Sequence, residues 1–305
     1  MTVLVVGSVA LDSVETPFGK ADEVLGGSAT FFSAAASHLC AVQLVGVVGD
    51  DYPTAKLDSL AKRGVDLAGL ERADGESFRW RGRYRHDLNS AETLETRLGV
   101  FSRFRPKIPD QFRRAPFVFL GNIDPRLQLE VLRQVERPKL VACDTMNFWI
   151  ESRRPDLLEL LKEVDLITLN DAEARQLTEE VNLVKAARKI IERGPRHVII
   201  KKGEHGAFMF TSSSVFYAPA YPLEDVFDPT GAGDSFAGGF IGYLARTGDL
   251  SEPNLKRAVV YGSAMGSFAV ERFSTGRFDE IGPRDIAARV REFHRLVTFE
   301  QDLFE

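Results

Sequence analysis

The residues best suited to chemistry lie between Val226 and Phe240, where a glycine-rich turn leads into a predicted helix with one early carboxylate. The Gly231-Ala232-Gly233 turn leaves backbone N–H groups unpaired at the positive end of the helix dipole, which forms a seat for a phosphate or another anion. Glycine permits close approach of the ligand and positive φ. We therefore predict an anion-binding turn.

Asp234 stands beside this turn, where a carboxylate would repel the anion unless it has a task. Abstraction of a proton from a nearby hydroxyl is such a task. The alternative is that Asp234 only complements the helix dipole. For the segment as a whole, chemistry is the better interpretation.

The composition predicts a soluble protein without nucleic-acid or membrane partners. The 305 residues include 39 basic and 44 acidic ones, a net charge of −5, which gives no support for nucleic-acid binding. No apolar run approaches the roughly 20 residues of a membrane span, and the short Met1–Val6 run reads as a first strand, not a signal peptide. Cys40 and Cys143 lack CxxC spacing and indicate reduced thiols in a cytoplasmic protein.

Apolar strands alternate with helices along the chain, which predicts an α/β fold with a mostly parallel sheet covered on both faces. The predicted strands are Val3–Val6, Gln43–Val48, Phe117–Leu120, Leu140–Ala142, Leu166–Leu169, His197–Ile200 and Ala207–Phe210. The predicted helices are Ala29–Leu39, Ala55–Lys62, Leu127–Val135, Leu157–Lys162, Ala172–Leu177, Val184–Glu192, Asp234–Arg246, Leu255–Val270 and Arg284–Leu296. Ligands of such sheets bind outside the carboxyl ends of the strands, where the Gly231 turn belongs.

Two more polar segments, about 12–26 and 77–105, interrupt this pattern and predict a small β-sheet lid or dimer contact inserted into one domain of residues 1–305. Residues 78–85 alternate strictly, so that one face of the strand carries a row of arginines and the other carries aromatic side chains. The arginines are Arg79, Arg81, Arg83 and Arg85, and the aromatic residues are Phe78, Trp80 and Tyr84. If the arginines face a pocket they would suit an anionic acceptor; the favoured interpretation is a solvated edge strand.

Two common nucleotide motifs are absent: there is no GxxxxGK[ST], and Phe236 occupies the third glycine position of GxGxxG. The segment Asp228–Phe236 instead resembles the DTxGAGD signature of the ribokinase-like, PfkB-type carbohydrate kinases. Further resemblances follow in the family's order, at Gly26-Gly27, Val45–Asp51, Asn170–Glu173 and Lys202–Gly206. The resemblance implies a three-layer sandwich with a β-sheet lid and transfer of the γ-phosphoryl group of ATP to a hydroxyl.

The resemblance also implies roles at the phosphate end of the site. Asp234 would be the base, and the N–H groups of Gly231, Ala232 and Gly233 would form the anion hole. Asn170 would bind the nucleotide and Glu173 would organise Mg²⁺ through water. The alternative is a helix cap followed by a first-turn acid, and both interpretations can hold together. Lys201, Gly203, Gly206 and Ser263 would lie along the nucleotide, and Asp228 and Thr230 match a site for K⁺.

On the acceptor side, Asp12 matches the carboxylate that binds acceptor hydroxyls, and Gly26 and Gly27, which resemble the N-terminal di-glycine signature, would also bind the acceptor. Ala10 and Phe31 replace polar residues of ribokinase proper, which argues against ribose itself and favours an acceptor with fewer polar contacts. Asn122, Asp124 and Asn147 follow strands and are further candidates for acceptor contacts, though Asx residues there often only form turns.

We therefore expect an ATP- and Mg²⁺-dependent kinase of a sugar or sugar-like molecule. The alternatives are a nucleoside kinase, a sugar-phosphate kinase and a non-catalytic nucleotide- or sugar-binding protein. A dinucleotide oxidoreductase is disfavoured by Phe236 and by the late position of the motif. A homodimer formed through the lid and dependence on K⁺ are further expectations.

Overall fold

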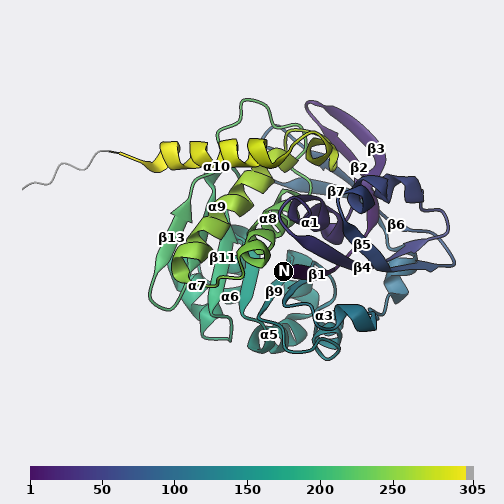
Figure 1. Cartoon of the computed structure of the whole chain (residues 1–305), viewed down its shortest axis with the longest axis horizontal. Coiled ribbons are helices and arrows are strands. Elements are labelled where there is room, and N and C mark those ends of the chain that lie inside the picture. Colours follow the sequence, from purple (N-terminus) through teal and green to yellow (C-terminus); the bar gives the residue numbers. More distant parts are fainter. Residues whose placement is uncertain (300–305) are drawn as a thin grey trace, which may run out of the picture.

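The structure of the protein, a computed structural model, describes residues 1–299 and is built around a nine-stranded sheet (Figure 1). The strand order is β13-β12-β11-β10-β9-β8-β1-β4-β5. Strands β11 through β5 in this order are parallel, and β12 and β13 add antiparallel pairs at one edge. The strands are β1 (Thr2–Val6), β4 (Ala41–Gly49), β5 (Val65–Ala73), β8 (Phe117–Leu120), β9 (Leu140–Asp144), β10 (Leu166–Asn170), β11 (His197–Lys201), β12 (Ala207–Phe210) and β13 (Val215–Ala218).

Helices cover both faces of this sheet, because successive residues of its central strands are apolar on both sides. In β1, Val3 and Val5 pack into one core and Leu4 and Val6 into the other. The first core is covered by α1 (Ser28–Ala36), α8 (Ala232–Thr247) and α9 (Glu252–Ala269), with α2 (Asp58–Lys62) beside them and α10 (Pro283–Val297) packed on α9. The second is covered by α3 (Pro125–Leu132), α5 (Arg154–Glu163), α6 (Asp171–Thr178) and α7 (Leu183–Ile191). The predicted three-layer α/β fold is confirmed.

A second, four-stranded sheet, the lid sheet, lies at one side of the molecule with the order β3-β2-β6-β7 (Figure 1). Its strands are β2 (Ala10–Thr16), β3 (Gly19–Gly26), β6 (Phe78–Tyr84) and β7 (Ala91–Arg97). They coincide with the two polar segments that interrupted the sequence pattern, except that β2 begins two residues before the first segment. Strands β2 and β6 are parallel, so residues far apart in the sequence share a face of this sheet.

Three elements were not predicted: β5, β13 and α4 (Asn147–Ser152). The first two lie at the edges of the main sheet. In β5, polar residues such as Asp66 and Glu71 interrupt the apolar run that marks a buried strand, and β13 is a strand of only four residues, Val215–Ala218. The predicted helix at 55–62 divides into a 3-10 turn, Thr54–Leu57, and the short α2.

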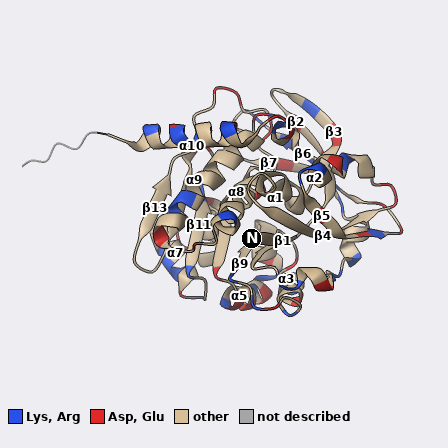
Figure 2. Ribbon diagram, in the orientation of Figure 1, with Lys and Arg blue, Asp and Glu red and all other residues tan. Residues whose placement is uncertain are grey.

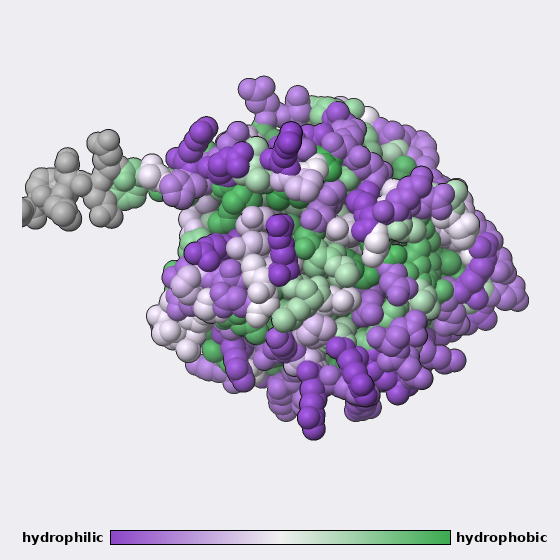
Figure 3. All heavy atoms as spheres, in the orientation of Figure 1, coloured by the Kyte–Doolittle hydropathy of each residue, from purple (hydrophilic) through white to green (hydrophobic). Residues whose placement is uncertain are grey.

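Positively and negatively charged residues are both spread over helices and loops, including the turns of α10 (Figure 2). Hydrophilic side chains dominate the rim of the face drawn in Figure 3, and apolar ones show between them nearer its middle. Within residues 1–299, no helix has the length and apolar character needed to span a membrane.

Candidate active site

The predicted anion turn lies at the start of α8, where Gly231 is the N-cap residue with φ 73° and ψ 3°, a left-handed conformation. A β-carbon on Gly231 would also lie 2.2 Å from the Phe31 ring, so both the backbone and the available space require glycine. No side chain caps the helix. Among the described residues, the N–H groups of Gly231 and Gly233 form no hydrogen bond, whereas Ala232 N–H donates to Pro229 at 3.2 Å. The turn therefore keeps free donors for an anion.

Asp234 lies in the first turn of α8, where it is half-buried near the charged groups of Asp144 and Lys201. Burial raises its pKa to about 7, and the charge of Asp144 adds to this effect while Lys201 opposes it. A carboxylate with a pKa near neutrality suits a general base, because it is ionised at working pH and still accepts a proton readily.

Lys201 and Asp144 end β11 and β9, the two neighbours of β10, and their side chains meet across its carboxyl end. The ammonium nitrogen of Lys201 lies 3.4 Å from Oδ2 of Asp144, and both side chains are largely buried. Burial alone would lower the pKa of Lys201, but Asp144, Glu173 and Asp234 outweigh it and the pKa is raised. Lys201 therefore carries a positive charge in an acidic site. Sequence reasoning did not name Asp144 as a site residue. The signal that could have found it is a charged residue at the end of an apolar strand, because such a residue lies at the carboxyl edge of the sheet.

Asn170 and Glu173 form a reciprocal capping box at the start of α6. Glu173 N–H donates to Asn170 Oδ1 at 2.8 Å, and Asn170 N–H donates to Glu173 Oε2 at 2.7 Å. Burial raises the pKa of Glu173 to about 7, with Asp144 adding to the effect and Lys201 opposing it. The cap interpretation thus holds, and it keeps the Glu173 carboxylate within the electrostatic reach of Asp234.

Asp12, on β2, is the carboxylate of the predicted acceptor side. A β-carbon on Gly26 would come 2.1 Å from its carboxyl carbon, so glycine is needed there for close approach. Burial, with Asp228 and Asp234 adding to it, raises the pKa of Asp12 to about 7, while Gly27 N–H opposes the rise. Gly27 is the N-cap of α1. The Asp12 carboxylate is thereby within reach of the same charged cluster as Asp234.

The aromatic face of β6 lies on the same side of the lid sheet as Asp12. The Cα partner of Trp80 is Asp12 in the parallel β2–β6 pair, so both side chains point to one face. A β-carbon on Gly82 would lie 2.1 Å from the Trp80 ring, so the indole occupies the space beside Gly82 that a side chain would fill. Tyr84, further along this face, contacts Thr230 Oγ1 through its hydroxyl at 3.4 Å.

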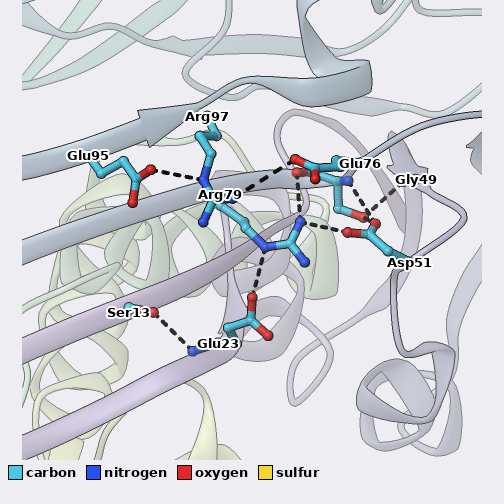
Figure 4. Close-up of polar contacts among 9 residues, drawn as sticks. Ser13, Glu23, Gly49, Asp51, Glu76, Arg79, Glu95 and Arg97 are labelled. Carbon is cyan, nitrogen blue, oxygen red and sulfur yellow. Dashed lines mark hydrogen bonds and ion pairs between the residues drawn. The ribbon is translucent and has the colours of Figure 1, made fainter.

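The arginine row points the other way. Arg79, Arg81 and Arg83 pair with Leu11, Ser13 and Glu15 of β2, on the face of the lid sheet opposite to Asp12. Figure 4 shows Arg79 reaching Glu23 and Asp51, with N–O distances of 2.8 and 2.6 Å. A hollow of about 240 Å³ lies on this outer face, lined by charged side chains such as Glu95 and Arg97. The row therefore does not reach the Asp234 site.

Two side-chain bonds fasten the β2–β3 half of the lid sheet to the loops beside α8. Thr16 Oγ1 donates to the Phe227 carbonyl at 2.9 Å, and Ser274 Oγ donates to the Leu25 carbonyl. The loops themselves are joined by buried Asp228, which accepts hydrogen bonds from the N–H groups of Thr230 (2.9 Å) and Ser274 (3.1 Å). Burial raises the pKa of Asp228, and these bonds oppose the rise.

The remaining residues that were predicted to bind the nucleotide lie on the loop after β11 and on α9. Gly203 and Gly206 both have positive φ, at either end of a 3-10 turn. The tip of the β6–β7 hairpin reaches this loop, where Asn89 Nδ2 donates to Glu204 Oε1 at 3.3 Å. Ser263 lies half-buried on α9.

Two of the three Asx residues predicted near the acceptor have structural partners, and the third is exposed. Asn122 accepts a hydrogen bond from Trp149 Nε1 at 2.9 Å. Asp124 caps α3 by accepting from Arg126 N–H at 2.9 Å, and Asn147 is an exposed residue at the start of α4. A direct role for them in acceptor binding stays a prediction.

The family model for pfkB family carbohydrate kinases matches residues 5–281. The chain is 30% identical over 259 residues to the cytidine kinase of Thermococcus kodakarensis, covering 83% of this chain and 91% of that protein. It is 25% identical over 173 residues to a nucleoside kinase of Methanocaldococcus jannaschii, covering 57% of this chain and 54% of that protein. The chain belongs to the pfkB family, and its reaction class is phosphoryl transfer to a hydroxyl acceptor.

Solved structures share the fold at low identity. The Methanocaldococcus jannaschii nucleoside kinase superimposes with a TM-score of 0.77 at 20% identity, over 95% of this chain and 98% of that one. A putative ribokinase II of E. coli in complex with ATP and Mg²⁺ gives 0.79 at 17% identity, over 95% and 99%. These similarities extend along both the main sheet and the lid sheet.

Proposed function

We propose that the chain transfers the γ-phosphoryl group of ATP to a hydroxyl of a nucleoside, with Asp234 as the base. The observation that carries the acceptor class is the aromatic surface beside Asp12. The Trp80 indole covers Gly82 on the same face as Asp12, and an aromatic ring next to a carboxylate would suit a base and its ribose hydroxyls. The substitutions at Ala10 and Phe31 support the same conclusion, because they leave few polar groups for a free sugar.

The positions of the groups around α8 support the following course for the phosphoryl transfer. Asp234 accepts the proton of the acceptor hydroxyl, and the acceptor oxygen forms a bond to the γ-phosphorus. The bond from that phosphorus to the β,γ-bridging oxygen breaks, and ADP leaves with the electron pair. The free N–H groups of Gly231 and Gly233 stabilise the charge on the moving phosphoryl group.

Mg²⁺ fits the donor set of the site. Proteins hold this ion with one or two carboxylates together with phosphate and water oxygens, and Glu173 supplies a half-buried carboxylate near Asp234. When bound, the ion would neutralise phosphate charge. A K⁺ ion beside Asp228 and Thr230 is a further part of the proposal, supported by the buried Asp228 carboxylate, which forms no ion pair with another described residue.

A panel of nucleosides and free sugars, assayed for ADP release with ATP and Mg²⁺, tests the proposal. We expect turnover of at least one nucleoside, and a kcat about 10²–10⁴-fold lower in Asp234→Asn with unchanged circular dichroism. The Trp80→Ala variant should raise the KM of nucleosides and leave free ribose unaffected. Preference for a free sugar would favour a sugar kinase, the function expected from the sequence. Full activity of Asp234→Asn would exclude Asp234 as the base.

A further inference from the structure

The Asp144 carboxylate is held in one orientation by its own neighbours. Its Oδ1 accepts a hydrogen bond from Thr145 N–H at 2.9 Å, which leaves Oδ2 directed at Lys201. The backbone carbonyl of Asp144 accepts from the buried amide of Gln128 at 3.1 Å, and the same amide binds Leu120 and Gly121 at the end of β8. The carboxylate is therefore part of a fixed strand end and not of a loose loop.

The ammonium of Lys201 is directed at the first turn of α8. A β-carbon on Gly233 would lie 2.9 Å from the ammonium nitrogen, closer than real β-carbons approach, so this nitrogen lies against the Gly233 backbone. A cation at a helix N-terminus is opposed by the helix dipole and by the free N–H groups there. Asp144, Asp234 and Glu173 compensate it in this structure.

We propose that the ammonium of Lys201 contacts the γ-phosphoryl group during its transfer, and that Asp144 is the positioning residue that aims this ammonium at the anion hole. The inference rests on the proposed use of ATP as donor. Lys201 keeps its proton throughout: it stabilises the charge on the phosphoryl oxygens while Asp234 takes the proton of the acceptor. Lys201 thus acts at the transferred phosphate, whereas the sequence assigned it to the nucleotide in general.

The test compares the affinities of a non-hydrolysable ATP analogue and of ADP, each with Mg²⁺, by titration calorimetry. In Lys201→Met we expect about a tenfold or larger loss of affinity for the analogue and less than about a threefold loss for ADP, because only the analogue carries the γ-phosphate. The kcat should fall about 100-fold. Lys162→Met is the matched control, since Lys162 forms an exposed pair with Glu159 (2.7 Å) on α5 and should change neither quantity.

Asp144 is tested with Asp144→Asn and Asp144→Glu. The Asn variant removes the charge that aims Lys201 and should shift the analogue-to-ADP affinity ratio in the same direction as Lys201→Met, by a smaller factor. The Glu variant keeps the charge and should retain more of the ratio. Because this ratio is a property of the folded fraction, partial loss of stability does not produce it.

Equal losses of ADP and analogue affinity in Lys201→Met would overturn the inference, as would equal impairment of Asp144→Asn and Asp144→Glu. These outcomes differ from failure of the proposed function. In that case the unmodified protein itself would neither bind the ATP analogue nor release ADP in the presence of any acceptor.

Discussion

The outer face of the lid sheet and the carboxyl edge of β9, β10 and β11 are both rich in charged residues, but the two regions differ in solvent exposure and in the balance of acidic and basic groups. On the outer lid face, arginines are matched by nearby acids, as between Arg79 and Glu23 (2.8 Å; Figure 4) and between Arg83 and Glu15 (3.2 Å). At the strand edge, buried Asp144 and half-buried Glu173 and Asp234 surround the ammonium of Lys201. Exposed pairs contribute little to stability or chemistry, whereas unbalanced buried charges cost free energy and mark the site of reaction.

The largest effect that would sharpen this comparison is expected from Gly231→Ala. The new side chain would require a left-handed backbone, which costs about 1–2 kcal/mol, and would collide with the Phe31 ring. Displacing the N–H donors of the anion hole should lower kcat/KM by about 100-fold or more. Steady-state kinetics with the best acceptor measures this.

Gly248→Ala is the matched control, because Gly248 ends the same helix with φ 67°. Its new β-carbon would meet only the flexible end of Met1. This variant should lose about 1 kcal/mol of stability and keep its kcat. If both variants lost activity equally, the turn at Gly231 would have no special role.

A smaller effect is expected for stability when Asp12 is replaced by Asn. Burial raises the pKa of Asp12 from 3.8 to about 7 in the folded chain, so the folded state holds a proton that the unfolded chain loses above pH 4. The free energy of unfolding therefore decreases as pH rises from about 4 to 7, and stays reduced above pH 7. Asp12→Asn removes this penalty, which corresponds to about 1.4 kcal/mol for each unit of pKa shift.

Thermal melts at pH 5 and pH 8 check the sign. Asp12→Asn should be more stable than the unmodified chain at pH 8, with a smaller difference at pH 5, while losing acceptor binding. Asp22→Asn, at an exposed lid carboxylate paired with Lys20, should show no such pH dependence. A stability gain that grew toward acid pH would contradict the assigned burial of Asp12.

The smallest effect is expected from Arg81→Glu. Arg81 lies on the outer lid face and forms no ion pair with another described residue, so charge reversal should change kcat/KM by less than about twofold. A loss of tenfold or more with an anionic acceptor would restore the sugar-phosphate alternative. Light scattering of the same samples tests the predicted lid-mediated homodimer.

The inner strands of the main sheet could be predicted because their signals are local. An apolar run such as Phe117–Leu120 can only be buried, and its observed bounds are those predicted. The turn at Gly231 is equally local, since glycine spacing and a following helix are sufficient to indicate an anion seat.

The missing parts depend on register between distant segments. Lys201 and Asp144 are 57 residues apart and meet only because β9 and β11 share β10 as neighbour. Alternation along β6 separates arginines from aromatic residues, but the face that covers the site follows from its pairing with β2, about 70 residues earlier. No local pattern carries that information.

The attachments of the lid sheet connect parts of the molecule that lie far apart in the sequence. Its β2–β3 half is fastened through Thr16 to Phe227 and through Ser274 to Leu25. Its β6–β7 hairpin contacts Thr230 through Tyr84 and Glu204 through Asn89. One four-stranded sheet therefore reaches both the turn before α8 and the loop that carries Gly203 and Gly206, so a displacement of the hairpin would be transmitted to both places.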